Sequence, residues 1–263
     1  MVSSNYNIEK ISDNIWSIED DFRCTVYIVN GKNKSIVIDT GMATSNNLKS
    51  MIEEIATHDP LVLLTHLHFD HVGHLKEFNE FFVSKDEVIF DEAKDYIDLN
   101  KAIYYEDGNY TFDLGDRIIK VLVLPGHTKG SCLIIDEKEK AIFTGDQFGS
   151  GCGVWMHVLD SVCISKYIES IGSFLNYLTN NYSFPINEWK LYGGHRSQEY
   201  TSSLCEYNPL NIEMVQNFKI LSEKLLKGEI ELHEKDTKVF NNETPYYVSY
   251  GNAEMVIRKS LIR

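Results

Sequence analysis

Along most of the chain the hydrophobic residues form short runs bounded by polar or glycine-containing turns, a pattern that predicts β-strands. The runs are Asn14–Ile18, Cys24–Asn30, Ser35–Asp39, Leu61–Thr65, Phe81–Ser84, Ile118–Leu124, Cys132–Ile135, Ala141–Thr144 and Trp189–Tyr192. Leu61–Thr65 is continuously apolar rather than alternating, which is typical of a strand in a sheet that is covered on both faces.

Other segments place apolar residues at helical spacing. The first is a helix with Leu48, Met51, Ile52 and Ile55 on one face and a cap at Thr44 or Ser45. Asp86–Leu99 predicts an acidic surface helix, and Ser161–Asn180 contains a core-facing helix. The last helix opens at Asn208-Pro209 and closes at Gly228. The last segment, Thr244–Arg258, predicts a hairpin or strand pair that turns at Gly251-Asn252.

The order of these elements predicts the fold class. Strands precede helices and the alternation is then repeated, which predicts two β-rich halves, each covered by helices. The apolar faces of the two sheets would then have to bury each other. No Pro-rich or low-complexity linker divides the halves, so we expect a single α/β domain over residues 1–263.

Composition excludes several classes of protein. The chain has 263 residues, of which 43% are hydrophobic and 24% charged, so general disorder and a collagen-like structure are excluded. The 25 Lys and Arg against 39 Asp and Glu give a net charge of −14, which argues against nucleic acid as the main partner. No apolar run approaches the roughly 18 residues of a membrane span, so we expect no membrane partner.

The cysteines and the N-terminal residues indicate in which cellular compartment the protein is expected. The cysteines are an odd, scattered set without a CxxC pair, namely Cys24, Cys132, Cys152, Cys163 and Cys205. This pattern predicts reduced thiols rather than a disulfide framework. Met1–Lys10 is polar and lacks the basic region followed by an apolar region that a signal peptide has, so we expect a cytoplasmic protein.

The densest group of chemically active residues follows the Leu61–Thr65 strand and reads His66-Leu67-His68-Phe69-Asp70-His71. Three histidines and an aspartate this close together have no packing rationale, because their desolvation and mutual repulsion on protonation would be destabilising without a cation. His66 and His68 point to the same side of an extended backbone, and Asp70 and His71 follow where the chain must turn. This spacing favours two adjacent metal ions over one.

Three more potential ligands stand at the ends of predicted core strands. His127 follows Pro125-Gly126, Asp146 follows Thr144-Gly145, and His195 follows Gly193-Gly194. Ligand-type side chains at the ends of successive core strands are typical of a site built on the rigid edge of a sheet.

These segments resemble, in order, the motifs of the metallo-β-lactamase superfamily. The motifs are Asp39-Thr40-Gly41, His66-x-His68-x-Asp70-His71, Pro125-Gly126-His127-Thr128, Thr144-Gly145-Asp146 and Gly193-Gly194-His195. They lie within residues of about 10 to 200, and the predicted C-terminal helix and strands occupy 201–263. The resemblance implies an αββα sandwich, with two mixed β-sheets packed face to face and helices outside.

The resemblance also implies a ligand set. His66, His68 and His127 would hold one metal ion, Asp70, His71 and His195 a second, and Asp146 would bridge the two. Asp39 and Asp70 are the catalytic candidates. Asp39 would accept a hydrogen bond from a ligand histidine, and Asp70 would also orient the attacking hydroxide. Two divalent ions are implied, with zinc the default, although the same nitrogen and oxygen donors accept iron or manganese.

The implied activity is that of a metal-dependent hydrolase, in which a metal-bridging hydroxide attacks a small-molecule ester, thioester or lactone. With an aspartate at the bridging position, the set of motifs resembles the glyoxalase II-like branch of the superfamily. No segment after His195 has the clustered Lys and Arg expected of a glutathione-carboxylate pocket, so glyoxalase II itself is not predicted. The alternatives are a small-molecule phosphodiesterase and an oxidoreductase of the single-iron sulfur dioxygenase type. The acidic balance disfavours a nuclease, and the oligomeric state is not predicted.

Four further polar residues have no assigned role in the motifs. His74 is either an outer partner of the site or a packed or exposed residue, and His58 and His233 are expected in solvent. Arg196 either meets an anionic group or forms a structural ion pair.

The segment Phe148–Val158 contains three glycines and is predicted to be too permissive for a regular strand. It carries Trp155 and His157 shortly after Asp146. Trp155 is either a core residue or, with His157, part of a wall that faces the substrate.

Overall fold

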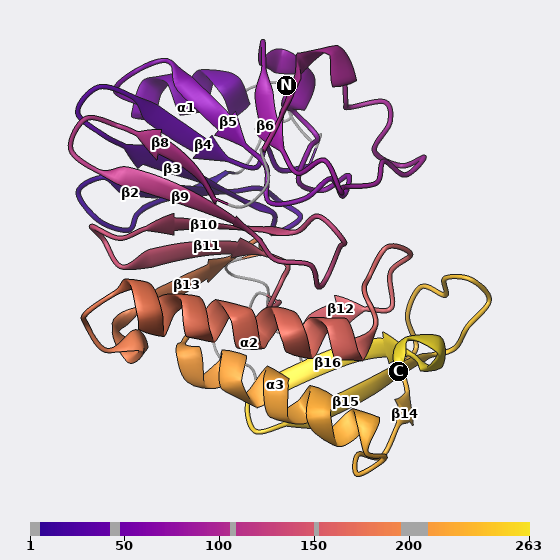
Figure 1. Ribbon diagram of the computed structural model, residues 1–263. Coiled ribbons are helices and arrows are strands. Elements are labelled where there is room, and N and C mark those ends of the chain that lie inside the picture. The colour runs from indigo at the N-terminus through magenta and orange to yellow at the C-terminus, as the bar shows by residue number, and fades with distance from the viewer. Residues whose placement is uncertain (1–5, 43–47, 106–108, 150–152, 196–209) are drawn as a thin grey trace.

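The computed structural model describes residues 6–42, 48–105, 109–149, 153–195 and 210–263. The predicted caps Thr44 and Ser45, the cysteines Cys152 and Cys205, Arg196, and the predicted helix start Asn208-Pro209 lie outside these ranges. In the described part, two β-sheets stack face to face with helices on the outer sides, so the predicted αββα sandwich is confirmed (Figure 1).

The N-terminal sheet has its strands in chain order. The strands are β1 (Asn7–Lys10), β2 (Ile15–Glu19), β3 (Thr25–Asn30), β4 (Ser35–Ile38), β5 (Pro60–Leu63), β6 (Phe81–Val83) and β7 (Ala102–Tyr104). The first four strands pair antiparallel, and β4 to β7 pair parallel. Parallel pairing requires crossover connections, and these connections carry α1 and the segment after β5.

The second sheet has the order β13-β11-β10-β9-β8. Its strands are β8 (Asn109–Asp113), β9 (Ile118–Val123), β10 (Cys132–Asp136), β11 (Ala141–Gly145) and β13 (Lys190–Gly193). β13 joins β11 in parallel, and the other pairs are antiparallel. The parallel pair brings the C-terminal ends of β11 and β13 side by side.

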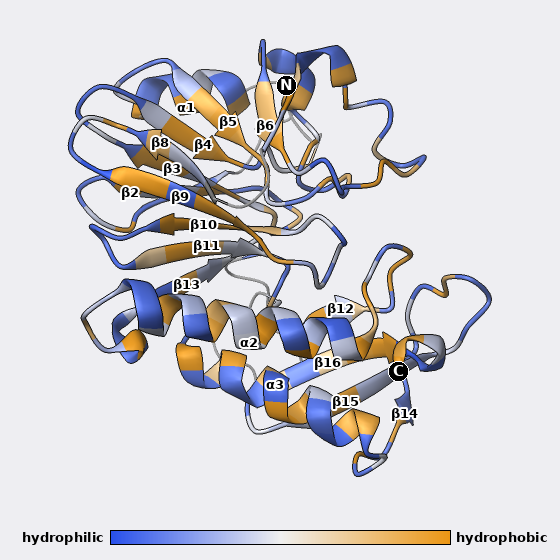
Figure 2. Ribbon diagram, in the orientation of Figure 1, coloured by the Kyte–Doolittle hydropathy of each residue, from blue (hydrophilic) through white to orange (hydrophobic). Residues whose placement is uncertain are grey.

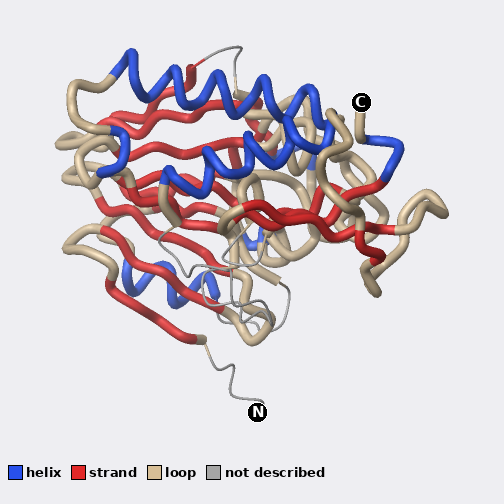
Figure 3. The backbone as a smooth tube through the Cα atoms, turned by 90° about the horizontal axis from the view of Figure 1, so that it is seen from below, coloured by secondary structure: helices blue, strands red, loops and turns tan. Residues whose placement is uncertain are grey.

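The helices are α1 (Leu48–Ile55), α2 (Ile164–Asn181) and α3 (Ile212–Leu226), with short 3₁₀ turns at Leu75–Glu77, Leu99–Lys101, Ile186–Glu188 and Lys259–Leu261. α1 lies on the outer side of the N-terminal sheet, and α2 and α3 lie on the opposite side of the sandwich (Figure 3). Bands of hydrophobic and hydrophilic residues alternate along α2 and α3 (Figure 2), as expected for helices that bury one face.

Neighbouring residues of the central strands enter different layers of the core. In β4, Ile36 packs between the two sheets, and Val37 packs toward α1. In β10, Ile134 lies between the sheets, and Ile135 packs toward α2 and α3. Because both faces of each sheet are covered, the central strands are apolar at successive positions, which explains the continuous hydrophobic runs.

The helices α2 and α3 and the terminal hairpin agree with the sequence prediction. α3 begins at Ile212, where the Asn211 side chain accepts a hydrogen bond from the backbone N–H of Met214 at 2.9 Å. Gly228 follows the helix with φ +70°, as a helix-ending glycine should. The hairpin consists of β15 (Pro245–Tyr250) and β16 (Ala253–Arg258). Within the described residues no helix has the length and apolar character needed to cross a membrane.

The predicted helix over Asp86–Leu99 is wrong. This stretch forms turns with i to i+3 hydrogen bonds, such as Ala93 N–H to the Phe90 carbonyl at 2.9 Å. Glu87 is drawn toward the ligand-bearing loops, where it accepts a hydrogen bond from the backbone N–H of Leu67 at 2.9 Å. Apolar residues of the stretch, such as Ala93 and Ile97, are buried in the core on the α1 side of the sheet. These tertiary contacts outweigh its local helix propensity.

A third, four-stranded sheet is the second difference from the prediction. It has the order β12-β16-β15-β14, where β12 is Val154–Met156 and β14 is His233–Glu234. β12 lies in the stretch that was predicted to be irregular. Gly153 adopts φ +85° and turns the chain, and the residues after it are free to extend in parallel against β16. The sheet packs against α3.

We expect the layer between the sheets to dominate stability. Ile134→Ala, at a fully buried position in this layer, should lower the free energy of unfolding by about 2–5 kcal/mol because it leaves a cavity. Ile118→Ala, where the side chain is 43% exposed at the start of β9, is the matched control and should change it by less than about 0.5 kcal/mol. Urea titrations of both variants test this, and equal losses would contradict it.

Candidate metal centre

The predicted ligands lie at the ends of strands from both sheets. His66 to His71 follow β5 of the N-terminal sheet, and Asp146 and His195 follow β11 and β13 of the second sheet. The backbone N–H of Cys132 donates to the Thr65 carbonyl at 2.8 Å and joins the sheets just before His66. All seven predicted ligands therefore meet at one edge of the sandwich.

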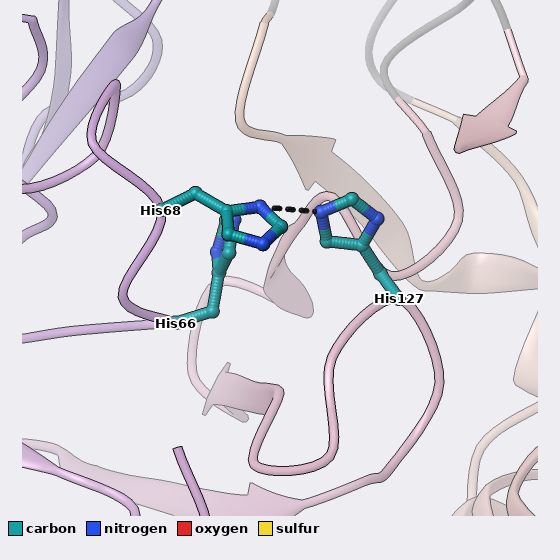
Figure 4. Close-up of side chains that lie close together, drawn as sticks. All are labelled: His66, His68 and His127. Atoms are coloured by element: carbon teal, nitrogen blue, oxygen red, sulfur yellow. Dashed lines mark hydrogen bonds between the residues drawn. The ribbon is translucent and has the colours of Figure 1, made fainter. Parts of the chain in front are cut away.

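Three of the histidines form a first group. His66, His68 and His127 each offer a ring nitrogen, and these nitrogens lie within 4.8 Å of one another. His68 Nδ1 and His127 Nε2 are 3.0 Å apart, as the dashed line in Figure 4 shows. The three rings stand nearly perpendicular to one another, with centroids 4.7 to 5.1 Å apart.

The carboxylate of Asp146 faces histidines of both predicted sets. Its Oδ1 lies 3.6 Å from His71 Nε2, and its Oδ2 lies 3.9 Å from His127 Nε2. The same Oδ2 lies 3.4 Å from His195 Nε2. Asp146 thus occupies the position that a bridging ligand needs.

Another group of possible ligands contains a residue that the motifs did not predict. A carboxylate oxygen of Asp70, a ring nitrogen of His195 and Sγ of Cys24 lie within 4.8 Å of one another. Asp70 Oδ2 is 3.4 Å from His195 Nε2 and 3.8 Å from His71 Nε2. The cysteine is separated from every motif in the sequence, so no spacing signal could have found it.

In three of the ligand histidines, the ring nitrogen that points away from the centre is held by an oxygen. His71 Nδ1 donates to Asp39 at 3.1 Å, His68 Nε2 to Asp160 at 3.3 Å, and His127 Nδ1 to the Trp155 carbonyl at 2.8 Å. Such contacts fix the ring and its tautomer and leave the inward nitrogen with a lone pair. The contact expected of Asp39 is therefore present, whereas Asp160 was not predicted.

These contacts provide a test of whether the residues fit a metal ion. In neutral rings held in this way, the lone pairs of His68 Nδ1 and His127 Nε2 face each other at 3.0 Å, which requires a proton or cation between them. His66 Nε2, His71 Nε2 and Asp146 Oδ1 are buried without a hydrogen-bond partner in the described residues. Such atoms are costly to bury unless a cation satisfies them. The nitrogen and oxygen donors fit divalent transition metals.

Burial and neighbouring charges separate the histidines into two classes. Burial lowers the pKa of His66 well below its usual value and that of His127 to about 4, and adjacent histidines add to both effects. Burial also opposes the charged form of His71 and His195, but Asp70 and Asp146 raise the pKa of both rings well above the usual value. His66 and His127 are therefore neutral at pH 7 and ready to coordinate, whereas the carboxylates beside His71 and His195 favour positive charge there, as a bound cation would supply.

Two glycines are required beside the ligands. A Cβ on Gly194 would stand 2.5 Å from His71 Cε1 and 2.6 Å from Asp146 Oδ1. Gly145 adopts φ +49°, and a Cβ there would stand 2.4 Å from the Thr65 hydroxyl. Glycine at these positions lets the backbone approach the ligands closely.

The remaining histidines lie away from the ligands. His74 is buried and its Nδ1 pairs with Glu77 Oε1 at 2.6 Å, so it is a packed residue. His58 and His233 are exposed, as expected. His157 is fully buried behind Trp155 and does not face the cavity, which corrects its expected place in the wall.

A cavity of about 350 Å³ opens above the ligands. Its floor contains ligand side chains such as Asp70, Asp146 and His195, and its walls are largely apolar. The apolar walls include Phe22, Phe69, Phe90, Trp155, Leu159 and Phe240. The Trp155 side chain is 39% exposed and lines this cavity, so the structure favours a wall over a core position.

Residues 20–215 match the family model of the metallo-beta-lactamase superfamily, which is more than half of the chain. The chain belongs to this superfamily. The matched region contains all of the strand-end motifs that were singled out in the sequence, from Asp39 to His195.

Two curated proteins of this superfamily illustrate the range of relatives. The acyl-coenzyme A thioesterase MBLAC2 of Homo sapiens is 26% identical over 211 residues, which cover 64% of this chain and 74% of that protein. Hydroxyacylglutathione hydrolase of Francisella philomiragia subsp. philomiragia is 30% identical over 139 residues, which cover 52% of this chain and 53% of that protein. The chain therefore spans only about half the length of the second relative.

Solved structures of the superfamily share the fold. The DIM-1 metallo-beta-lactamase has a TM-score of 0.61 at 17% identity and covers 83% of this chain and 97% of its own. ST1585 from Sulfolobus tokodaii has a TM-score of 0.55 at 18% identity and covers 88% of this chain and 91% of its own. At these identities the similarity shows the fold alone.

Glu87 is a further site residue that sequence reasoning missed. Its carboxylate accepts hydrogen bonds from the backbone N–H of Leu67, between two ligands, and from the hydroxyl of Thr128, which follows His127. Burial raises the pKa of Glu87 to about 7. Glu87 therefore joins the two loops of the first histidine group.

We expect Asp146→Ala to reduce bound metal and activity together, because Asp146 faces both groups of ligands. Metal analysis of the purified proteins should find about two ions per chain in the wild type and one or fewer in the variant. Asp13→Ala, at an exposed surface aspartate, is the control and should retain both ions. Two ions and near-normal turnover in Asp146→Ala would show that the assigned ligand set is wrong.

Glu87 gives a prediction for the pH dependence of stability. Because its folded pKa of about 7 lies above the usual 4.5, the carboxyl favours the folded chain while protonated, and this contribution disappears as the pH rises through about 7. Relative to Glu87→Gln, the metal-free protein should lose about 1–2 kcal/mol of unfolding free energy between about pH 5 and pH 8. Urea titrations at both pH values measure this, and a pH-independent difference would refute it.

Proposed function

We propose that this protein is a metal-dependent thioesterase that hydrolyses small-molecule thioesters with an apolar acyl group. The observation that carries the proposal is the joining of two features in one cavity. Asp146 at its floor lies within 3.4 to 3.9 Å of ring nitrogens of His71, His127 and His195, and apolar side chains form its walls. Hydrolysis adds water to the thioester carbonyl and breaks the C–S bond, which yields a carboxylic acid and a thiol.

The polar floor supplies the reaction centre. Metal ions held there would polarise the carbonyl and lower the pKa of water to about 7. The chain's own contribution is to fix the geometry. Asp39, Asp160 and the Trp155 carbonyl hold the outward nitrogens of three ligand rings, so the inward nitrogens need no reorganisation when substrate binds.

Asp70 is the carboxylate best placed to orient the attacking water. Its side chain lines the cavity and is 21% exposed, whereas Asp39 lies behind His71 and is buried. Burial raises the pKa of Asp70, but His71 and His195 outweigh this and lower the pKa below its usual range. The ionised carboxylate can accept a hydrogen bond from water beside the scissile carbonyl.

The walls indicate an apolar acyl group. Phe22, Leu159 and Trp155 line the cavity and are 55%, 41% and 39% exposed, so they stand toward its open mouth. Apolar surface in a concave site binds apolar ligands and excludes water. Lys238 is the only Lys or Arg among the described residues that line the cavity, and it pairs with Glu92 at 3.2 Å. This arrangement is less suited to a phosphodiester, whose charge calls for cationic side chains.

The relatives support the same reaction class. The human relative is named an acyl-coenzyme A thioesterase, and the bacterial relative is named a hydroxyacylglutathione hydrolase. Both names describe the release of an acyl group from a thiol carrier. For this chain we propose that the acyl group of the substrate is apolar, and we do not specify the thiol that carries it. Zinc is the proposed ion at both positions, since its coordination chemistry suits imidazole and carboxylate ligands.

A substrate panel tests the function. The zinc-loaded protein should hydrolyse acyl thioesters of increasing chain length with kcat/KM rising by at least about tenfold from acetyl to medium-chain acyl groups, because each buried CH₂ adds about 0.8 kcal/mol. Lactones, phosphodiesters and β-lactams are the parallel substrates. Preferred turnover of a phosphodiester, or bound iron with oxygen consumption on a thiol substrate, would refute the proposal.

Trp155→Ala separates substrate choice from chemistry on the same panel. Metal content should stay unchanged, because the hydrogen bond from His127 goes to the backbone carbonyl of Trp155, which the substitution keeps. The preference for long acyl groups should fall. Leu226→Ala on α3, at a side chain that is 41% exposed away from the cavity, is the matched control. A uniform loss across all acyl lengths would contradict a role of Trp155 in selecting the acyl group.

A further inference from the structure

Cys24 lies beside the metal centre, outside all of the sequence motifs. Its Sγ lies within 4.8 Å of a carboxylate oxygen of Asp70 and a ring nitrogen of His195. The residue is only 2% exposed, and its thiol lines the floor of the cavity. The thiol therefore lies next to the position where the second predicted set of ligands would hold a metal ion.

We infer that Cys24 is a thiolate ligand of the metal position bordered by Asp70 and His195. The inference rests on the metal binding in the proposed function but not on the choice of substrate. It adds a sulfur donor to a set that the motifs describe as nitrogen and oxygen only.

A tight turn fixes the cysteine at the start of β3. Asp20 Oδ1 accepts hydrogen bonds from the backbone N–H of Phe22 at 2.8 Å and of Cys24 at 3.0 Å. Arg23 adopts φ +69°, a left-handed conformation that reverses the chain between them. Phe22 is thereby left at the mouth of the cavity while Cys24 is directed to its floor.

The next residues attach this turn to the strand end that carries His195. The backbone N–H of Thr25 donates to the Gly194 carbonyl at 2.7 Å, and the Tyr27 hydroxyl donates to the Gly193 carbonyl at 2.6 Å. Cys24 and His195 are thus each one residue away from a direct backbone hydrogen bond. Their proximity is built into the contact between the two sheets and does not depend on a flexible side chain.

His71 provides an independent indication of a ligand at this place. The residue is 1% exposed, and its Nε2 has no hydrogen-bond partner within the part of the chain that the structure describes. This nitrogen lies 3.8 Å from Asp70 Oδ2 and 3.6 Å from Asp146 Oδ1. Sulfur and nitrogen ligands of a tetrahedral zinc ion are about 3.5 Å apart, so a group within 4.8 Å can close around an ion by small side-chain rotations.

A thiol that coordinates a metal ion is deprotonated outright by the ion. A thiolate ligand also favours zinc over harder ions such as manganese at this position.

Cys132 shows what a purely structural cysteine looks like in this fold. It is fully buried in β10 between the sheets, and its thiol contacts the Gly130 carbonyl at 3.2 Å. It belongs to none of the ligand groups in the described residues. Cys132 is therefore a matched control for a buried, reduced thiol.

The first test uses the 263-residue chain without substitution. Zinc-loaded protein examined by X-ray absorption should show sulfur at about 2.3 Å in addition to nitrogen and oxygen ligands. Cobalt-loaded protein should show a thiolate-to-cobalt charge-transfer band in the near ultraviolet. The absence of sulfur from both spectra in protein that holds two ions would overturn the inference.

Two variants identify the sulfur. Cys24→Ser should remove both signals and raise the Kd of one of the two zinc ions by at least about tenfold, whereas Cys132→Ala should keep both signals and both ions. Persistence of the sulfur signal in Cys24→Ser would assign it to another cysteine and overturn the inference.

Metal content distinguishes this failure from that of the proposed function. Wild-type protein that binds no metal overturns the metal centre and the role of Cys24 together. Two bound ions without sulfur overturn the role of Cys24 alone and leave the proposed hydrolase intact.

Discussion

The carboxylate of Asp39 makes the contacts on which the arrangement of the site depends. It accepts hydrogen bonds from the backbone N–H of Thr65 at 2.8 Å, from the Thr65 hydroxyl at 2.7 Å and from His71 Nδ1 at 3.1 Å. Asp39 itself has φ +62°, a left-handed conformation that aspartate tolerates better than most residues. One side chain thus joins the end of β4 to the ligand-bearing segment after β5 and orients a ligand ring.

The apolar walls and the polar floor of the cavity have different structural origins. The floor comes from strand ends, which the two sheets and their shared core hold in place. Apart from Trp155 in β12, the walls come largely from connecting segments, such as the turn with Phe22 and the stretch with Phe90. Connecting segments tolerate sequence change more readily than core strands do. The fold can therefore keep one reaction centre while the walls adapt to different substrates.

The sequence predicted those features that a single local pattern encodes. The central strands and α2 follow from hydrophobic runs and helical spacing, and the clustering of the candidate ligands at strand ends follows from short motifs such as His66 to His71. Features that depend on contacts between distant segments were missed. The stretch Asp86–Leu99 was predicted as a helix because its local composition permits one, but Glu87 is held by Leu67 and Thr128, which are far away in the sequence. Asp160 and Cys24 reach the site in the same way, through the folding of loops that carry no spacing signal.

The division of the ligands between the two halves has a consequence for biosynthesis. The first half supplies His66, His68, Asp70 and His71, and the second supplies His127, Asp146 and His195. During translation, which adds about 5–20 residues per second, the N-terminal sheet emerges with four ligands that have no partners from the second sheet. The complete centre can form only after β13 has left the ribosome and paired beside β11. A metal ion that needs ligands from both sheets could therefore bind only late, once the fold is complete.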